Sequence, residues 1–200
     1  MCVVEQHRLF VAINLPAGIK EKITATQVEL REGLAGASII WTKREQLHLT
    51  LKFLGNINVQ LVTGLKAQLA AACHGFGPLR LRARRLGVFP NARFPRVIWL
   101  GLTDNDGKLA SLQSSLESAS RQFSSQQPEN EFTGHVTLGR IKRINRHGSK
   151  TLSELLVKMA DRTFGEWTAC EVELMRSELT SDGARHSSLE IVPLSRSQGN

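Results

Sequence analysis

The chain has 200 residues, of which 41% are hydrophobic and 22% are charged, a composition typical of a folded globular domain rather than a disordered or fibrous chain. Its formal net charge of +8 favours a polyanionic partner, nucleic acid above all, although a generally basic soluble protein has the same balance. No segment is long and apolar enough to span a membrane, and the first apolar run is too short for a signal peptide.

The three cysteines are sparse and widely spaced. None of Cys2, Cys73 and Cys170 stands in a Cys-x-x-Cys or Cys-x-x-His pair, which argues against a zinc site. An odd, scattered set also fits a reducing compartment better than a disulfide framework. We therefore expect a cytoplasmic protein that uses neither a metal ion nor another cofactor.

Strands and helices are interspersed along the chain. Alternating or continuous apolar runs predict strands, and apolar residues three and four positions apart predict helices. In chain order the expected elements are a strand at 8–16, a helix at 17–32, strands at 39–43 and 47–53, a turn at Gly55-Asn56, a helix at 58–73, strands at 78–90 and 96–102, a helix at 106–123, a strand at 132–141, a basic loop at 142–150, a helix at 151–160, and a hairpin of strands at 167–179 and 187–194.

The order of these elements predicts an α+β fold with a mostly antiparallel sheet, because regular βαβ units and Gly-rich nucleotide loops are lacking. The succession strand–helix–strand–turn–helix occurs more than once, which indicates an internal duplication. We expect residues 1–195 to form one domain and residues 196–200 to be a frayed tail.

The strand at 47–53, "LHLTLKF", carries an unusual polar face. Strict alternation puts its leucines and Phe53 on the core face, and it puts His48, Thr50 and Lys52 together on the other face. A histidine and a threonine side by side on a strand fit an ordinary solvent face, or they fit half of a site.

The strand at 132–141 repeats the pattern with His135 and Thr137 on one face. In both strands an apolar residue follows the histidine and another follows the threonine, and none of the other four histidines has a threonine two positions later. One His-x-Thr match would be unremarkable, but two of this form indicate two halves of one site.

Two such strands facing each other across a cleft could flank one phosphorus atom. One imidazole would take a proton from the attacking oxygen, and the other would give a proton to the leaving oxygen. The threonine hydroxyls would hold the non-bridging oxygens. This acid–base chemistry needs no metal and suits the opening of a cyclic phosphodiester, in which the attacking and leaving groups lie in line.

With these motifs the sequence resembles the 2H phosphoesterase superfamily, and within it the RNA 2′,3′-cyclic phosphodiesterases, also called 2′–5′ RNA ligases. The resemblance extends from "RLFVAINLP" at 8–16, through both motif strands, to "SELTSDGARHSSLEIVPL" at 177–194. It implies a bilobal, pseudo-twofold fold with outer helices and a central cleft lined by one His-Thr strand from each lobe. It also implies hydrolysis of RNA 2′,3′-cyclic phosphate ends to 2′-phosphates, and we expect a monomer that needs no metal.

The resemblance assigns a role to each motif residue. His48 would protonate the leaving 3′ oxygen and His135 would activate water, while Thr50 and Thr137 would hold the phosphate. The sequence itself does not distinguish the two histidines. Two other functions stay open: 2′–5′ ligation of RNA ends by the reverse step, and an RNA-end-binding module without turnover, against which the presence of both motifs argues.

Three positions depart from the family pattern. Gly134 stands where the family usually has proline, and Gly139 stands where it usually has alanine. His186 stands where the family often has tyrosine. The glycines loosen the strand and keep the site open, and His186 leaves open the contact that the tyrosine ring makes.

Other residues have two readings each. By simple alternation Arg140 lies on the face opposite His135, unless a bulge after Gly139 turns it toward the phosphate, which is the role that the resemblance implies. Phe10 fits either the core or a platform for a nucleobase. Lys52 fits either a phosphate contact or a solvated strand end.

Three further features are charged or aromatic. An alternating stripe on the strand at 78–90 fits a solvated face or an RNA-backbone track, and it consists of Arg80, Arg82 and Arg84. The basic loop at 142–150 would contact RNA beyond the terminal nucleotide if it overhangs the cleft. Trp41 and Trp99 lie in apolar strands and are most simply core residues.

Overall fold

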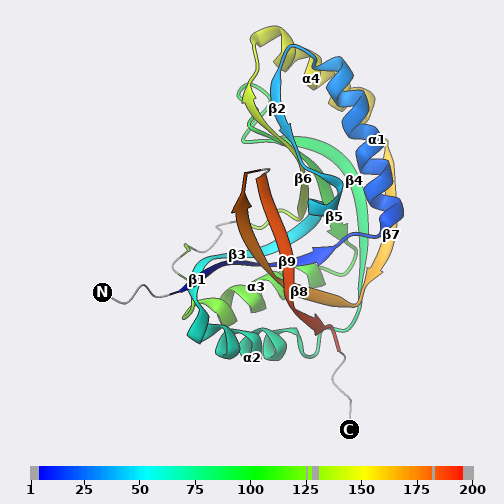
Figure 1. The fold of residues 1–200 in the computed structure, drawn as a ribbon. Helices are drawn as coiled ribbons and strands as arrows, with labels where there is room; N and C mark the ends of the chain where they lie inside the picture. Colours follow the sequence, from blue (N-terminus) through cyan, green and yellow to red (C-terminus); the bar gives the residue numbers. More distant parts are fainter. Residues whose placement is uncertain (1–4, 125, 128–130, 182, 196–200) are drawn as a thin grey trace.

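Two antiparallel β-sheets form the framework of the molecule (Figure 1). They are seen in a computed structural model that describes residues 5–124, 126–127, 131–181 and 183–195. The first sheet has the order β3-β1-β8-β9 and consists of β1 (Gln6–Asn14), β3 (His48–Asn58), β8 (Glu171–Thr180) and β9 (Gly183–Pro193). The second has the order β2-β6-β5-β4-β7 and consists of β2 (Ser38–Trp41), β4 (Leu79–Phe89), β5 (Val97–Asp104), β6 (His135–Arg143) and β7 (Thr163–Ala169).

Four α-helices of the described chain lie outside the two sheets. They are α1 (Ala17–Gly33), α2 (Val62–Cys73), α3 (Lys108–Ser120) and α4 (Arg146–Lys158), accompanied by the short 3₁₀ helices η1 (Arg44–Gln46) and η2 (Val59–Leu61). Helices α2 and α3 pack together beside the first sheet, and α1 and α4 pack together beside the second (Figure 1). The predicted α+β fold with outer helices is confirmed. No helix in the described ranges is long and apolar enough to cross a membrane.

Each sheet takes strands from both halves of the chain. Strands β2 and β4 come from the first half, yet they hydrogen-bond to β6 and β7 of the second. Conversely, β8 and β9 come from the end of the chain and complete the sheet of β1 and β3. The two lobes are therefore interlocked, and neither half of the sequence holds a whole sheet. The tail predicted at 196–200 lies outside the described residues.

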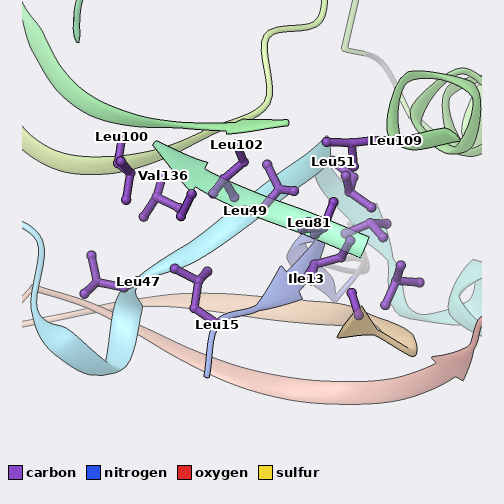
Figure 2. Packing of buried hydrophobic residues seen from close by; sticks show 14 of the residues in the cluster. Ile13, Leu15, Leu47, Leu49, Leu51, Leu81, Leu100, Leu102, Leu109 and Val136 are labelled. Atoms are coloured by element: carbon purple, nitrogen blue, oxygen red, sulfur yellow. The ribbon is translucent and has the colours of Figure 1, made fainter. Parts of the chain in front are cut away.

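One continuous cluster of buried aliphatic side chains joins the two sheets (Figure 2). The alternating leucines of the first motif strand lie in it, since Leu47 and Leu49 are 0% exposed and Leu51 is 1% exposed. Val136 and Leu100 enter the same cluster from the second sheet. Burying each such side chain contributes roughly 1.5–3 kcal/mol, so the apolar face of both motif strands is held firmly in place.

A β-bulge in β3 changes the predicted faces of its second half. Ala12 pairs with Thr50 and Val11 pairs with Lys52, so Leu51 is an extra residue on its strand. Beyond the bulge the alternation is inverted: Lys52 is only 2% exposed, whereas Phe53 is 45% exposed. The predictions that Phe53 lies in the core and that Lys52 shares the His48 face are therefore wrong.

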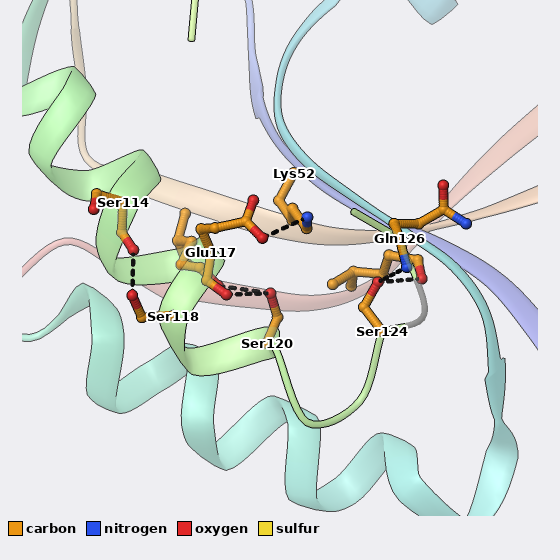
Figure 3. A network of polar contacts seen from close by, with 9 residues as sticks. Lys52, Ser114, Glu117, Ser118, Ser120, Ser124 and Gln126 are labelled. Atoms are coloured by element: carbon orange, nitrogen blue, oxygen red, sulfur yellow. Dashed lines mark hydrogen bonds and ion pairs between the residues drawn. The ribbon is translucent and has the colours of Figure 1, made fainter. Parts of the chain in front are cut away.

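The inverted alternation places the Lys52 ammonium in a polar network beneath β3 (Figure 3). Its Nζ lies 2.7 Å from Oε1 of Glu117 on α3, and both side chains are largely buried. A buried charge is tolerated only with a partner, so this pair ties helix α3 to the motif strand. Both sequence readings of Lys52, the phosphate contact and the solvated strand end, give way to a structural role.

The structure departs from the sequence prediction at several element boundaries. Gly55 and Asn56 form no turn but continue β3, where Gly55 takes a φ of +75° that glycine tolerates. The segment at 167–169 belongs to β7 in the second sheet, and Cys170 separates it from β8. The segment at 142–150 is the end of β6 and the first turn of α4 rather than a free loop, because Asn145 caps the helix by accepting a hydrogen bond from the Gly148 amide.

Candidate active site

The two motif strands have the same backbone irregularity, a β-bulge. In β6, Thr137 pairs with Trp99 and Gly139 pairs with Ile98, which leaves Leu138 as an extra residue. Leu138 follows its threonine as Leu51 follows Thr50 in β3. Both strands therefore carry a bulge directly after the His-x-Thr motif, and in each strand the residue three positions after the threonine returns to the face of the histidine.

This bulge decides the position of Arg140. Arg140 pairs with Val97, two residues before Trp99 on β5, so it lies on the same face as Thr137 and His135. Its side chain is exposed. The bulge begins one residue earlier than the sequence reading anticipated, but it has the same consequence for the arginine. The corresponding position in β3 is Phe53, an aromatic residue.

The fold brings the two motif strands together although 87 positions separate their histidines. Strands β3 and β6 belong to different sheets, and their Cα atoms approach within 8 Å of each other. His48 and His135 are each the first residue of their strand, and both are half-buried. Thr50 and Thr137 are half-buried as well, and neither hydroxyl makes a hydrogen bond within the described ranges, so both are available to a ligand.

His48 sits in an aromatic cluster of the first sheet. Its ring stacks on Phe10, with centroids 4.9 Å apart and an angle of 28° between the planes. His186, on β9, stands edge-on to both rings, at 5.4 Å from His48 and 5.0 Å from Phe10. Residues of β1 and β9, far from His48 in the sequence, thus fix the orientation of the first motif histidine.

This packing controls the charge of His48. Burial, with smaller contributions from the neighbouring His186 and Lys20, lowers the pKa of the imidazole to about 4, against a hydrogen bond to the Gln46 backbone that raises it. Burial also lowers the pKa of His186. In the unliganded protein at pH 7 the His48 ring is therefore neutral.

Phe10 is a wall of this cluster. It is 2% exposed, and its ring is covered by His48 and His186 while Phe53 lies 5.9 Å away. Little of the ring remains for a nucleobase. The exposed Phe53, which the sequence assigned to the core, is the aromatic surface that solvent reaches on this face.

His135 is oriented by a backbone contact and by two aromatic rings. Its Nδ1 lies 2.7 Å from the carbonyl oxygen of Thr133. A carbonyl can only accept, so Nδ1 carries the hydrogen and Nε2 is left for substrate or water. Phe89 and Trp99 stand edge-on to the imidazole at 5.1 and 6.5 Å.

Trp99 is a site residue that the sequence assigned to the core. Its indole stacks on Phe89 and lies over Gly87, where an added Cβ would come within 2.3 Å of the ring. Glycine at this position lets the tryptophan lie flat beside His135. The sequence did not indicate that Trp99 lies in the site, because in an apolar strand a tryptophan on the site face has the same pattern as one in the core.

A polar group beside His48 was also not anticipated. Asn14 pairs with His48 across β1 and β3, and its side-chain amide donates a hydrogen bond to the carboxylate of Glu173. Glu173 is buried on β8 and attracts the Lys20 ammonium, although burial gives Lys20 a lowered pKa overall. These residues place a fixed carboxylate and a cation at the edge of the aromatic cluster.

The remaining candidates are the arginines of β4 and Trp41. Arg80 and Arg82 form ion pairs with Glu166 on β7 at 3.2 and 2.7 Å, as expected of a solvated charge stripe. Arg84 lines a cavity of about 370 Å³ beside Trp99 and Gly134. Trp41 packs against the aliphatic core, as predicted. Within the described ranges, no three residues of the usual metal-ligating types gather at one place.

The family description "LigT like Phosphoesterase" matches the chain twice, at residues 13–99 and at 100–186. Together the two matches cover most of the sequence, and they start 87 positions apart, the same spacing as His48 and His135. The chain belongs to this family of phosphoesterases. The predicted internal duplication and the 2H resemblance are both confirmed.

Curated relatives of similar length carry one name. The chain is 31% identical to the RNA 2′,3′-cyclic phosphodiesterase of Methanothermobacter thermautotrophicus, over 94% of this chain and 98% of that protein. It is 32% identical to the protein of the same name from Methanocaldococcus jannaschii, over 88% and 94%. The relative from Aquifex aeolicus is 31% identical, over 92% and 95%.

Solved structures agree with the fold. E. coli LigT complexed with 3′-AMP superposes with a TM-score of 0.75 at 25% identity, over 95% of this chain and 99% of that chain. The protein TT0787 of Thermus thermophilus superposes with a TM-score of 0.73 at 26% identity, over 96% and 100%. The bilobal fold with duplicated antiparallel sheets is therefore that of LigT.

Proposed function

We propose that this protein is an RNA 2′,3′-cyclic phosphodiesterase, which hydrolyses the cyclic phosphate at an RNA end to a 2′-phosphomonoester by acid–base catalysis. The observation that carries the proposal is the pair of His-x-Thr strands. They come from the two halves of the chain, each carries a bulge directly after its motif, and they lie against each other. The names of the curated relatives support the same reaction.

Each motif residue has a defined part in this reaction. Nε2 of His135, opposite the Nδ1 held by the Thr133 carbonyl, takes a proton from the attacking water. His48 returns a proton to the 3′ oxygen as the P–O3′ bond breaks, and the 2′ oxygen keeps the phosphate. Thr50 and Thr137 donate hydrogen bonds to the non-bridging oxygens, and Arg140, on the His135 face, adds a charge-assisted contact.

The acid role of His48 depends on the substrate. With a pKa of about 4 the ring is neutral in the free protein, so it must gain a proton when the phosphate binds. An anionic phosphate beside the imidazole favours the charged form and raises the pKa, so the ring takes up the required proton from solvent at neutral pH. The nearby carboxylate of Glu173 is engaged by the Asn14 amide, so the histidine remains the better candidate for the acid.

We further propose that the protein acts as a monomer in the cytoplasm. Both motif histidines come from one chain, so a second copy is not needed to complete the site. Cys73 and Cys170 are both free thiols, which supports a reducing compartment. Light scattering during gel filtration tests the first statement, and fractionation of the source cells tests the second.

The reaction is tested by incubating the purified protein, with EDTA, on an RNA oligonucleotide that ends in a 2′,3′-cyclic phosphate. We expect a 2′-phosphate end, formed far more slowly by the His48→Ala variant. A 3′-phosphate product would reverse the choice of leaving group, and loss of activity in EDTA would overturn the metal-independent mechanism. Binding without turnover would instead leave an RNA-end-binding module, and joining of a 5′-hydroxyl RNA would establish ligation.

A further inference from the structure

A basic groove lies at the far end of β6 from His135. It has a volume of about 830 Å³ and is formed by the β4–β5 loop, the end of β6 and the first turns of α4. Six cationic residues line it, and no carboxylate is among the described residues of its lining. They are Arg93, Arg96, Lys142, Arg143, Arg146 and Lys150.

These cations are exposed and largely unneutralised. Within the described ranges only Lys150 meets a carboxylate, that of Glu154 at 3.8 Å, and none of the five other groove cations makes an ion pair. The arginines of the β4 stripe show the contrast, because Arg80 and Arg82 share Glu166. A concave surface with several unpaired cations attracts a polyanion.

The groove also has an ordered aromatic edge. Phe94 is 61% exposed, and the Arg93 guanidinium lies over its ring at 5.2 Å from the centroid. The side chain of Asn91 accepts hydrogen bonds from the amides of both residues at 3.1 Å, which holds this loop in shape. An exposed ring between cations is a surface on which an unpaired base stacks.

Strand β6 connects this groove to the motif. The bulge at Leu138 puts Arg140 on the His135 face, and by alternation Lys142 follows it on that face at the entrance to the groove. At about 3.3 Å per residue the distance from His135 to Lys142 is roughly 20 Å, which an extended RNA strand spans with several nucleotides. Positive charge thus continues from the motif to the groove without interruption by a described acidic residue of β6.

We propose that this groove binds the phosphate backbone of the RNA several nucleotides before the reacting end. The inference rests on the proposed function of the motif site and adds a second binding region to it. The terminal nucleotide binds at the two motif histidines. The upstream RNA strand follows β6 and enters the groove, where arginines contact phosphates and Phe94 stacks on a base. Longer single-stranded RNA is therefore a better substrate than a dinucleotide.

The test compares the Arg143→Ala/Arg146→Ala variant with a control variant, Lys22→Ala/Arg121→Ala, which removes two exposed cations outside the groove. The substrates are a dinucleotide and a single strand of about twelve nucleotides, which is long enough to reach a groove of this kind. Both end in a 2′,3′-cyclic phosphate. We expect the groove variant to lose about tenfold in kcat/KM on the longer RNA and nothing on the dinucleotide. Its salt slope on the longer RNA should fall by about 1.4, the value for two lost phosphate contacts.

A binding measurement separates this proposal from the reaction. Fluorescence anisotropy with the same longer RNA, ending in hydroxyls, should show weaker binding by the groove variant than by the control, even if no protein preparation turns over a cyclic phosphate. Equal affinity of the two variants for this RNA would overturn the proposal that the groove binds RNA, whatever the catalytic result. Loss of binding to phosphatidylserine vesicles without loss of RNA binding would assign the groove to a membrane surface instead.

Discussion

The regions around His48 and His135 use the same backbone and different neighbours. Each histidine begins a strand, precedes its threonine by two positions and is followed by a bulge at a leucine. His48, however, stacks on Phe10, meets His186 edge-on and has a pKa lowered to about 4. His135 is held by the Thr133 carbonyl and edged by Phe89 and Trp99. Duplication supplies two equal imidazoles, and packing gives them unequal surroundings.

The largest effect is expected from removing either imidazole. His48→Ala and His135→Ala should each lower kcat by roughly 10²–10⁴-fold, the usual contribution of one acid–base group. An RNA end with sulfur in place of the 3′ oxygen has a leaving group that needs no proton. It should restore activity to the variant that lost the acid, His48→Ala, and not to His135→Ala. Rescue of the other variant would exchange the two roles.

The residue after each bulge offers a second comparison. The side chain of Lys52 points inward to Glu117 of α3. Its counterpart Gly139 lies against Trp41, whose nearest ring atom would be 3.1 Å from an added Cβ. Lys52→Met leaves a buried carboxylate unpaired and should lower the free energy of unfolding by about 3–5 kcal/mol, measured in urea. Lys52→Met/Glu117→Leu should recover most of that loss. If the double variant does not recover stability, the stabilising effect of Lys52 does not come from its pair with Glu117.

The lowered pKa of His48 makes stability depend on pH. The unfolded chain binds a proton near the ordinary pKa of 6.5, whereas the folded protein resists it until about pH 4. This contribution to stability is present above pH 6.5 and is lost as the pH falls toward 4, by up to about 3 kcal/mol. Urea unfolding at several pH values should show a steeper loss for the wild type than for His48→Gln.

A variant of His186 tests the cause of the lowered His48 pKa. Because His186 lowers the pKa of His48 electrostatically, the His186→Phe variant should raise that pKa while the ring still fills the space beside Phe10. The shift is followed through the His48 imidazole resonances by NMR. An unchanged pKa would leave burial and Lys20 as the causes of the lowering and would remove His186 from the control of the His48 charge.

The smallest effect is expected at the positions where the bulges return the chain to the site face, Arg140 and Phe53. Arg140→Ala should lower kcat/KM about ten- to a hundredfold, since one charge-assisted hydrogen bond to phosphate contributes roughly 1.5–3 kcal/mol. Phe53→Ala should affect RNA with an unpaired base near its end more than inorganic phosphate binding. Equal rates for Arg140→Ala and the wild type would place the arginine outside the site.

The candidate site was accessible from sequence in part, for a physical reason. His-x-Thr pairs are local, and a strand places residues i and i+2 on one face whatever surrounds it, so His48, Thr50, His135 and Thr137 could be recognised before any fold was known. The position of Arg140 needed a bulge, and a bulge depends on the pairing of neighbouring strands. The neighbours Trp99 and Glu173 come from other strands and carry no local signal.

The sequence by itself determined the alternation that builds the core, the helices outside the sheets and the spacing of 87 positions that repeats the motif. These features depend on the side-chain period of single segments and on duplication. Tertiary structure alone decided that β2 and β4 join the sheet of the second half, that Lys52 turns inward and Phe53 outward, and that six cations gather in one groove. Such features depend on long-range strand pairing, which no local pattern specifies.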